Sequence, residues 1–311
     1  MMKKIENMVS LEGLLYEHKL EVKISGDNSK NPGTEYIAGT ISIATDGEEC
    51  LNIVPVHFSY VTAKTSTGKD NRNYKIFKRI IDGELETVMG SGKENAAKLH
   101  VDSAIDLNEF YIKGDDGIEL VSSKRIEGGF VSEVSSIADD ITKRNFFRAD
   151  MLITKVAILP EDEERQLPVK ANVSGYIFNF RKDILPVSFS ATNPSAMSYF
   201  EGLGVSEREP VFTKIWGSQL SQTIVRTRET KSAFGETLVD KSEYSRKDYI
   251  ITGAAQETYE WDSEDSITAK DVTEMLAARE IKLATLKKNR EDYDAAKAAP
   301  AAKTPQGDFG F

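Results

Sequence analysis

Two stretches of the chain carry the same pattern: Val54-Pro55-Val56-His57-Phe58-Ser59 in the first half and Leu185-Pro186-Val187-Ser188-Phe189-Ser190 in the second. Their surroundings match as well. An apolar segment that starts with glycine precedes each copy, at 39–43 and 175–180, and a short helical stretch that ends at glycine follows, at 74–83 and 195–202. An internal repeat of this kind indicates duplicated structural units. We therefore expect two copies of one β-rich module.

The signals around the first copy predict three strands, one helix and two more strands. Alternating apolar residues indicate strands over 15–25, 36–44 and 52–61, followed after a polar loop by a helix over 74–83. A strand over 98–105 and a hairpin over 110–125 complete the unit, whereas 1–14 is expected to be a weakly ordered lead-in. This order of elements is that of the OB fold, a five-stranded Greek-key barrel.

The predicted fold is mainly β, with two tandem OB-like β-barrel modules at 1–145 and 146–266. Residues 135–150 serve as the connection, and the strands of the second module are expected to start at Met151. Thr268 and Asp271 resemble a capping box, which predicts a C-terminal helix over 267–292. The remainder, 293–311, is rich in Ala and Pro, so we expect a disordered tail.

Composition places the chain among ordinary globular proteins. It has 311 residues, of which 40% are hydrophobic and 29% charged, and its formal net charge is −10. This acidic total argues against coating of duplex DNA by bulk charge. Cys50 is the single cysteine, which favours a reducing compartment. No apolar run is long enough to cross a membrane and no secretory signal is evident, so we expect a cytoplasmic protein.

Residue patterns for catalysis or metal binding are absent from the sequence. The three histidines, His18, His57 and His100, are scattered, and no Cys/His spacing resembles a zinc site. The chain has neither a Walker phosphate-binding loop nor a Gly-x-Ser-x-Gly elbow. The sequence therefore predicts a protein that is not an enzyme and that needs no cofactor or metal. An enzyme whose site leaves no motif is the minor alternative.

Aromatic residues interleaved with basic residues are the main binding signal. Single-stranded nucleic acid is held in this way, because rings stack on bases while cations contact phosphates. The alternative is that alternating aromatic residues on a strand, above all Phe178, belong to the core. The candidate nucleic-acid contacts are Tyr60, Lys64, Lys69, Arg72, Tyr176, Phe178, Arg181, Lys182, Trp216 and Arg226.

The chain ends in Asp308-Phe309-Gly310-Phe311, after a segment rich in Ala and Pro. This end resembles the tail tip of bacterial and phage single-stranded-DNA-binding proteins, an acidic peptide with a terminal Phe that recruits repair and replication proteins. The family's tip has several consecutive acids and a Pro before the final Phe, whereas Asp308 is the only nearby acid here and Gly310 stands in the place of Pro. The resemblance implies that Asp308, Phe309 and Phe311 bind partner proteins.

Taken together, the module order and the tail resemble phage-encoded OB-fold single-stranded-DNA-binding proteins. The resemblance implies a non-enzymatic protein of the host cytoplasm that coats exposed single-stranded DNA, with self-association on the DNA, during replication or recombination. It also implies replication and recombination proteins as partners of the tail. The alternative is a duplicated-β structural or assembly protein, such as a virion component, that ignores nucleic acid.

Overall fold

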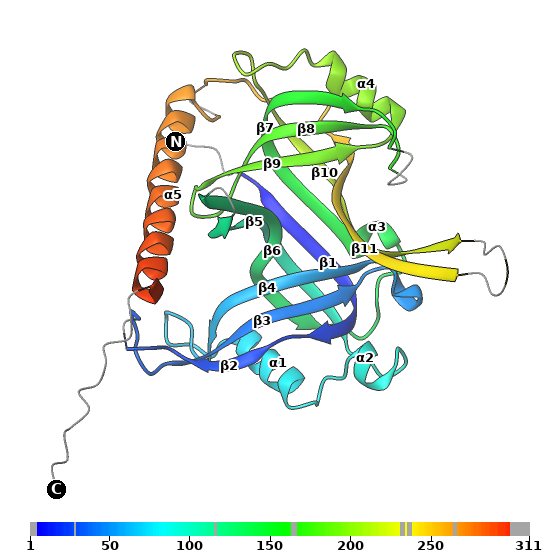
Figure 1. The fold of residues 1–311 in the computed structure, drawn as a ribbon, viewed down its shortest axis with the longest axis vertical. Helices are drawn as coiled ribbons and strands as arrows, with labels where there is room; N and C mark the ends of the chain where they lie inside the picture. The colour runs from blue at the N-terminus through cyan, green and yellow to red at the C-terminus, as the bar shows by residue number, and fades with distance from the viewer. Residues whose placement is uncertain are drawn as a thin grey trace, which may run out of the picture.

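The fold is known from a computed structural model, which describes residues 5–298 apart from 28, 115–116, 163–166, 231–233, 235–237 and 264–265. At 48, 224–230 and 238–244 only the backbone is described. Figure 1 shows two groups of strands, one below and one above, with a long helix along one side. The strands join into one eleven-stranded sheet. The fold is therefore mainly β with a C-terminal helix, as the sequence predicts.

The first module is a closed ring of five strands. β1 pairs with β3, β3 with β4, β4 with β6, β6 with β5, and β5 with β1 again. Helix α1 lies between the third and fourth strands of the ring, as in an OB-like barrel. The elements are β1 (Asn7–His18), β3 (Glu35–Ala44), β4 (Ile53–Thr62), α1 (Arg72–Ile81), β5 (Lys98–Gly114) and β6 (Gly117–Glu133).

The second module repeats this ring with the same order of elements. β7 pairs with β8, β8 with β9, β9 with β11, β11 with β10, and β10 with β7. In both modules the pairing between the third and fifth strands is parallel and the others are antiparallel. The elements are β7 (Asn145–Leu159), β8 (Lys170–Phe178), β9 (Ile184–Ala191), α4 (Pro194–Gly202), β10 (Val211–Thr230) and β11 (Leu238–Ala254).

The repeated sequence pattern lies on equivalent strands, β4 and β9, but two positions out of register. The first strand of each module has a bulge, between Leu15 and Glu17 in β1 and between Ile153 and Lys155 in β7. One residue of the second strand lies beside each bulge. That residue is Ile43 in β3, which pairs with Val54, and Gly175 in β8, which pairs with Val187. Val54, not Val56, is therefore the counterpart of Val187. The shift is an even number of residues, so the inward-facing side chains of the two strands still correspond.

The two modules are joined by their first strands. The start of β1 pairs with the start of β7 in antiparallel register, with Val9 opposite Phe147. Two sequence expectations are wrong here. Residues 7–14 are part of β1 and not a loose lead-in, and β7 starts at Asn145 rather than at Met151. The β-propensity of the sequence does not indicate these strand ends. The start of β1 is a strand because it pairs with β5 on one side and β7 on the other.

Each module carries one long hairpin. The first hairpin, β5–β6, pairs from Leu99 and Glu133 to Gly114 and Gly117 with one bulge, so the expected short strand over 98–105 and separate hairpin over 110–125 are one element. The hairpin reaches the second module through Lys124. The ammonium group of Lys124 donates a hydrogen bond to the Ser188 carbonyl and lies about 5 Å from the ring centres of Phe189 and Tyr249. Burial lowers the pKa of Lys124 below the ordinary lysine value.

Helix α1 closes one end of the first barrel. Asn71 caps it by accepting a hydrogen bond from the Asn73 amide, and Gly83 follows its end in a left-handed conformation (φ 79°). The apolar spacing of the sequence places Phe77 and Ile80 on the buried face. Phe77 meets Phe58 of β4 edge to face, with 4.6 Å between ring centres. The predicted helix is therefore confirmed. The Phe77 ring packs α1 against β4 in the barrel core.

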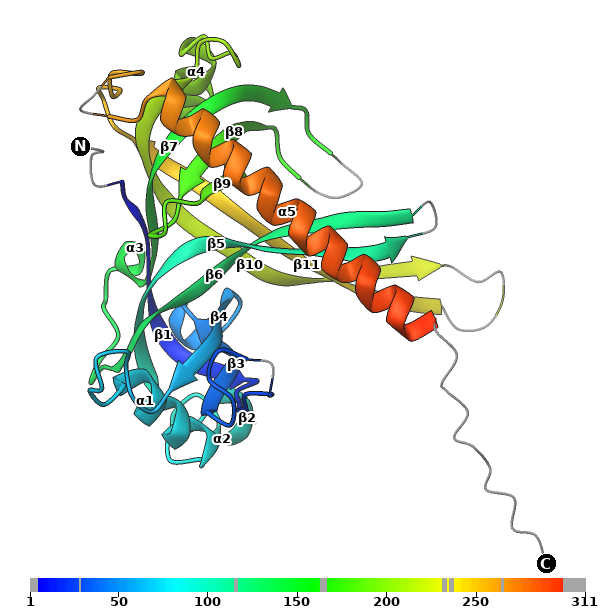
Figure 2. The ribbon, with the colours of Figure 1, turned by 90° about the vertical axis from the view of Figure 1, so that its left-hand side faces the viewer.

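Helix α5 (Ala269–Ala298) is the long C-terminal helix. Thr268 and Asp271 form the predicted capping box: the Asp271 carboxylate accepts from the Thr268 amide at 3.0 Å, and the Thr268 hydroxyl accepts from the Asp271 amide at 3.1 Å. The helix continues past its expected end at Asp292, so 293–298 is helical and not tail. Figure 2 shows it crossing the molecule diagonally, and it contacts β5 and β9.

Short elements fill the connections. They are β2 (Glu21–Ile24), which pairs with β3, the 3-10 turn η1 (Gly47–Glu49), α2 (Val88–Ser91) and α3 (Ile141–Arg144). Within the part of the chain that the structure describes, no helix is both long and apolar enough to span a bilayer.

Candidate nucleic-acid interface

Tyr60 lies near the end of β4 with 47% of its surface exposed. Its ring contacts that of Tyr36 on the neighbouring strand, with 4.5 Å between ring centres, and its hydroxyl lies 3.3 Å from the Ser25 hydroxyl. These contacts fix the direction of the ring and leave one side in solvent. Tyr60 is therefore placed on the surface as the sequence predicts.

The cations predicted to accompany Tyr60 lie in the loop after β4 and at the start of α1. Lys64 pairs with Asp70, which also pairs with Lys75 at 2.7 Å, and these cations lower the pKa of Asp70 to about 2. Lys69 and Arg72 are exposed, and neither is ion-paired within the described residues. Lys69 and Arg72 are thus available to an anionic ligand, whereas Lys64 already has a partner.

In the second module, Phe178 is a core residue and not a ligand contact. Its side chain is 1% exposed and meets Phe212 edge to face, with 6.4 Å between ring centres. The aromatic residues Tyr176, Phe178 and Phe180 alternate in the sequence but do not all lie on one strand face, because β8 ends at Phe178. Tyr176 is half-buried beside Leu152 and Pro186 of the neighbouring strands. Phe180 lies beyond the strand and is 85% exposed.

The turn between β8 and β9 carries the two predicted cations of this module. The Asn179 side chain holds the turn by accepting from the amides of Arg181 and Asp183, both at 2.9 Å, and Lys182 adopts a left-handed conformation (φ 67°). Arg181 lies over the Phe180 ring at 5.1 Å, a cation–π contact at an exposed site. Neither Arg181 nor Lys182 has an ion-pair partner among the described residues.

The remaining predicted residues lie elsewhere or outside the described parts. Trp216 is half-buried in β10 and packs so closely on Gly253 that a Cβ there would come within 2.4 Å of the indole nitrogen. The backbone of Arg226 belongs to β10 and pairs with Ser242, but its side chain is not described. Asp308, Phe309 and Phe311 lie outside the described residues. The predicted contacts therefore fall in three separate places rather than on one strip.

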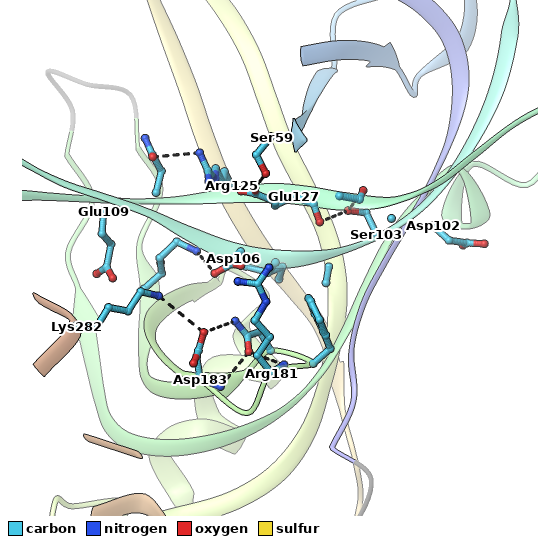
Figure 3. Close-up of a pocket in the computed structure, with 18 of the residues that line it drawn as sticks. Ser59, Asp102, Ser103, Asp106, Glu109, Arg125, Glu127, Arg181, Asp183 and Lys282 are labelled. Carbon is cyan, nitrogen blue, oxygen red and sulfur yellow. Dashed lines mark hydrogen bonds and ion pairs between the residues drawn. The ribbon is translucent and has the colours of Figure 1, made fainter. Parts of the chain in front are cut away.

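Arg181 and Phe180 border a cleft between the two modules, which we call the α5 cleft. It is lined by the base of the β5–β6 hairpin, the β8–β9 turn and α5, with a volume of about 680 Å³ (Figure 3). A second exposed ring, Phe130 of β6, lines the same cleft and is 78% exposed. The cleft thus has two large aromatic rings in solvent and one guanidinium group stacked on the first ring.

Carboxylates of the α5 cleft are largely neutralised by cations of the chain. Glu109 is held by both terminal nitrogens of Arg279, and the two side chains are 5% and 13% exposed. This pairing lowers the pKa of Glu109 against the opposing effect of burial. Arg125 pairs with Glu127, and in Figure 3 Lys282 points toward Asp183, at 3.8 Å. Asp102 and Asp106 also line the cleft, without an ion pair to lysine or arginine among the described residues, and Arg181 and Lys182 are the unpaired cations at its rim.

Phe130 is the site residue that the sequence did not indicate. Gly128 and Gly129 precede it in left-handed conformations (φ 69° and 96°), and a Cβ on Gly129 would lie 1.9 Å from the Asp102 carbonyl. They form a bulge opposite Ser103, between the Asp102–Phe130 and Ala104–Glu127 pairs, which turns the next side chain outward. The pair of glycines before an aromatic residue was the available signal, since glycine in a strand marks a bulge.

Among the described residues, no three His, Cys, Asp or Glu side chains are grouped so that they could hold a metal ion. His100 lies between two carboxylates, 3.0 Å from Glu12 and 3.2 Å from Asp102, and forms one side of a small polar cluster. The exposed rings and cations of the interface thus lie beside several carboxylates of the α5 cleft.

Comparison with known proteins finds similarity to solved structures and to one family. One of these structures is a deletion mutant of the single-stranded DNA binding protein from Thermus aquaticus, at 8% sequence identity and a TM-score of 0.44, covering 84% of this chain and 98% of that one. No curated protein matches the sequence. The YorF family model matches residues 6–289. Because this match spans most of its length, the chain belongs to the YorF family.

Proposed function

We propose that the protein binds single-stranded DNA without catalysing a reaction, by stacking bases on exposed rings and contacting phosphates with nearby cations. The observation that carries this proposal is the pair of exposed rings in the α5 cleft, Phe180 and Phe130, with Arg181 over the first. Large apolar side chains held in solvent usually mark a binding surface. Base stacking on such rings tolerates any sequence, because every base has a π face.

The two OB-like rings support the same proposal. Barrels of this strand order bind oligonucleotides along their second and third strands and the adjoining loops. Tyr60, Lys69 and Arg72 lie at the end of the third strand of the first module and in the loop after it. A strand of DNA would run from the rings of the α5 cleft past Ser59, which lines the cleft, to Tyr60 and these cations.

Only the unpaired bases of single strands can reach the rings, so duplex DNA is expected to bind much more weakly. Phosphate neutralisation releases counterions, so affinity should fall steeply as salt rises. The net charge of −10 should increase the preference for single-stranded over duplex DNA, because the bulk charge repels DNA and only local cations attract it. We further propose that the protein acts in replication or recombination. It would self-associate on DNA and bind partner proteins through its Phe-terminated tail.

One titration tests the proposal. The full chain is titrated with fluorescein-labelled oligo-dT and with a duplex of equal length at two salt concentrations, with anisotropy as the readout. We expect tight binding of oligo-dT at low salt, steep weakening at high salt and much weaker duplex binding. Lack of oligo-dT binding at low salt would leave the structural or assembly protein as the better reading. Equal affinity for the duplex would contradict the stacking mechanism.

A further inference from the structure

The duplication gives the molecule a second cleft at the position that corresponds to the α5 cleft. The α5 cleft lies where the fourth and fifth strands of the first module meet the β8–β9 turn of the second. The second cleft lies where the fourth and fifth strands of the second module, β10 and β11, meet the β3–β4 turn of the first. We call it the Trp216 cleft; its volume is about 1140 Å³.

The two clefts differ in what covers them. α5 follows the last strand of the second module and crosses the α5 cleft, where it supplies Arg279 to Glu109, Lys282 to Asp183, and Leu286 to the lining. The segment that follows the last strand of the first module contains only the single turn of α3. α3 borders the Trp216 cleft without crossing it, so the second cleft is larger and open to a ligand.

The Trp216 cleft has an apolar lining that is exposed to solvent. Leu51 and Ile141 are each 59% exposed, and Phe146 and Trp216 are half-buried beside them. These side chains come from both modules and form one contiguous surface. An apolar surface of this kind on a soluble protein usually marks an interaction site.

Two polar atoms of the Trp216 cleft lack hydrogen-bond partners. The Gln219 side chain is 5% exposed, and its amide nitrogen has no hydrogen-bond acceptor. One oxygen of Asp46 is likewise buried without a donor. Glu12, Asp46 and Glu49 form no ion pair with lysine or arginine among the described residues, although Glu12 contacts His100 at 3.0 Å. Of the cations beside the cleft, Lys143 pairs with Asp140 at 3.8 Å and Arg144 donates to the Ala138 carbonyl. Buried polar groups without partners are costly, so the site suits a ligand that supplies them.

We infer that the Trp216 cleft is a docking site for a helical segment of a partner protein, with a leucine-type residue flanked one turn away by lysine or arginine. The face of α5 that carries Arg279, Lys282 and Leu286 has this chemistry, because residues three and four apart lie on one side of a helix. A helix in an apolar groove with complementary charge at its rim is a common mode of recognition. Single-stranded DNA and the chain's own acidic terminus would both bring negative charge to unneutralised carboxylates.

The test uses α5 itself as the source of a probe. A fluorescein-labelled synthetic peptide with the sequence of residues 276–290 carries the required leucine and basic residues, and a second peptide has every Lys and Arg replaced by Glu. The full-length protein carries Trp261→Phe, which leaves Trp216 as the single tryptophan. Anisotropy reports binding, and a change in Trp216 emission reports that binding occurs at this cleft.

We expect the basic peptide to bind and to change Trp216 emission, with affinity at least tenfold above that of the Glu peptide. Ile141→Glu and, separately, Leu51→Glu should weaken binding at least tenfold; both side chains are mostly exposed, so folding should be retained. Glu109→Gln, in the α5 cleft, is the matched control and should leave affinity within twofold. The inference fails if the basic peptide does not bind or if it binds the Ile141 and Leu51 variants normally. It also fails if oligo-dT displaces the peptide and itself changes Trp216 emission.

Discussion

Asn7 and Asn145, the first residues of β1 and β7, make the same pair of hydrogen bonds in the two modules. The Asn7 side chain donates to the Ile105 carbonyl at 2.9 Å and accepts from its amide at 3.0 Å. The Asn145 side chain donates to the Gln219 carbonyl at 2.6 Å and accepts from its amide at 3.0 Å. Each asparagine thus fixes the base of the long hairpin of its own module, and the duplication extends to single side chains.

We predict that Asn7→Ala and Asn145→Ala each lower the free energy of unfolding by ~1–3 kcal/mol, because each leaves a backbone amide of the hairpin without its side-chain acceptor. Urea denaturation followed by circular dichroism measures this loss. Asn172→Ala is the control, since that side chain only donates to the Ser174 hydroxyl at 3.4 Å on a half-exposed face. A loss no larger than that of the control would show that the hairpins are held by their strand pairing alone.

Phe178 and Phe180 provide a matched pair that separates folding from binding. Phe180→Ala should weaken oligo-dT binding by ~1–3 kcal/mol and leave the melting temperature nearly unchanged, because the ring is 85% exposed. Phe178→Ala should lower stability by ~3–5 kcal/mol through the cavity it leaves. The measurements are anisotropy titration and thermal melting of both variants. Normal oligo-dT binding by the Phe180 variant would remove this ring from the interface.

The bidentate pair between Arg279 and Glu109 should hold α5 against the β5–β6 hairpin. Arg279→Ala leaves the buried Glu109 carboxylate without its ion-pair partner, although the Ser122 hydroxyl still donates to it, and this is expected to cost ~3–5 kcal/mol. Faster trypsin cleavage within α5, after Lys287 or Lys288, would report the loosened helix. The double variant with Glu109→Ala should recover part of the loss, because the unpaired charge is then removed. If the single and double variants are cleaved equally fast, the pair does not position the helix.

The same pair predicts a pH dependence. The pKa of Glu109 is lowered in the folded protein, so its pairing stabilises the fold above the unfolded value of about 4.3 and is lost as pH falls through the folded pKa. The stability difference between the wild type and Glu109→Gln should therefore be largest near neutral pH and shrink in acid. Urea denaturation of both proteins across this range checks it. A difference that stays constant down to the acid limit would mean that Glu109 does not titrate with folding.

Lys124 should show a pH dependence of the same sign as the acid pair, but in the alkaline range. Its pKa is lowered by burial, so the folded protein releases this proton more easily than the unfolded chain does, and stability rises as pH rises toward about 10.4. Asp248 and Lys170 lie nearby and affect the same charge. We expect the stability of wild type relative to Lys124→Met to increase between neutral and alkaline pH. Titration of the tyrosines affects both proteins equally and so cancels in this difference. A stability difference that does not change with pH would contradict the burial of the Lys124 charge.

Deletion of 305–311 tests the tail, which lies outside the described residues. We expect oligo-dT binding to stay intact or to become slightly stronger, since an anionic tail competes with DNA for cations. Pull-down of replication or recombination proteins should be lost, whereas replacement of Gly310 by Pro, the residue found in the resembled family, should keep it. A truncated protein that retains every partner would show that the tail has another role.

The order of elements could be predicted from the sequence because turns and apolar alternation are local signals. Glycine residues and the Asp46-Gly47 turn indicate where β3 and β4 begin and end. The spacing of Phe77 and Ile80 predicts helix α1. The capping box at Thr268 was also readable, because both of its hydrogen bonds are made within one turn. The interior of each module therefore follows from residues that are close in sequence.

The joint between the modules could not be predicted, because it depends on pairing between distant strands. The segment from Asn7 to Gly13 is polar enough to resemble a loop, and only its position between β5 and β7 makes it a strand. The interface has the same limitation. Phe178 and Phe180 look alike in the sequence, and the end of β8 between them decides which ring is core. Phe130 is exposed because the Gly128–Gly129 bulge turns it outward.

The pairing of β1 with β7 has a mechanical consequence. Two barrels on a flexible linker could swing independently and adapt their spacing to whatever they bind. Here a continuous run of backbone hydrogen bonds joins them, so their separation and relative orientation are fixed in the free protein. The protein should therefore cover a constant length of an extended ligand, because the spacing of its two barrels does not change. Pulled from its ends, or heated, it should come apart in one cooperative event rather than barrel by barrel.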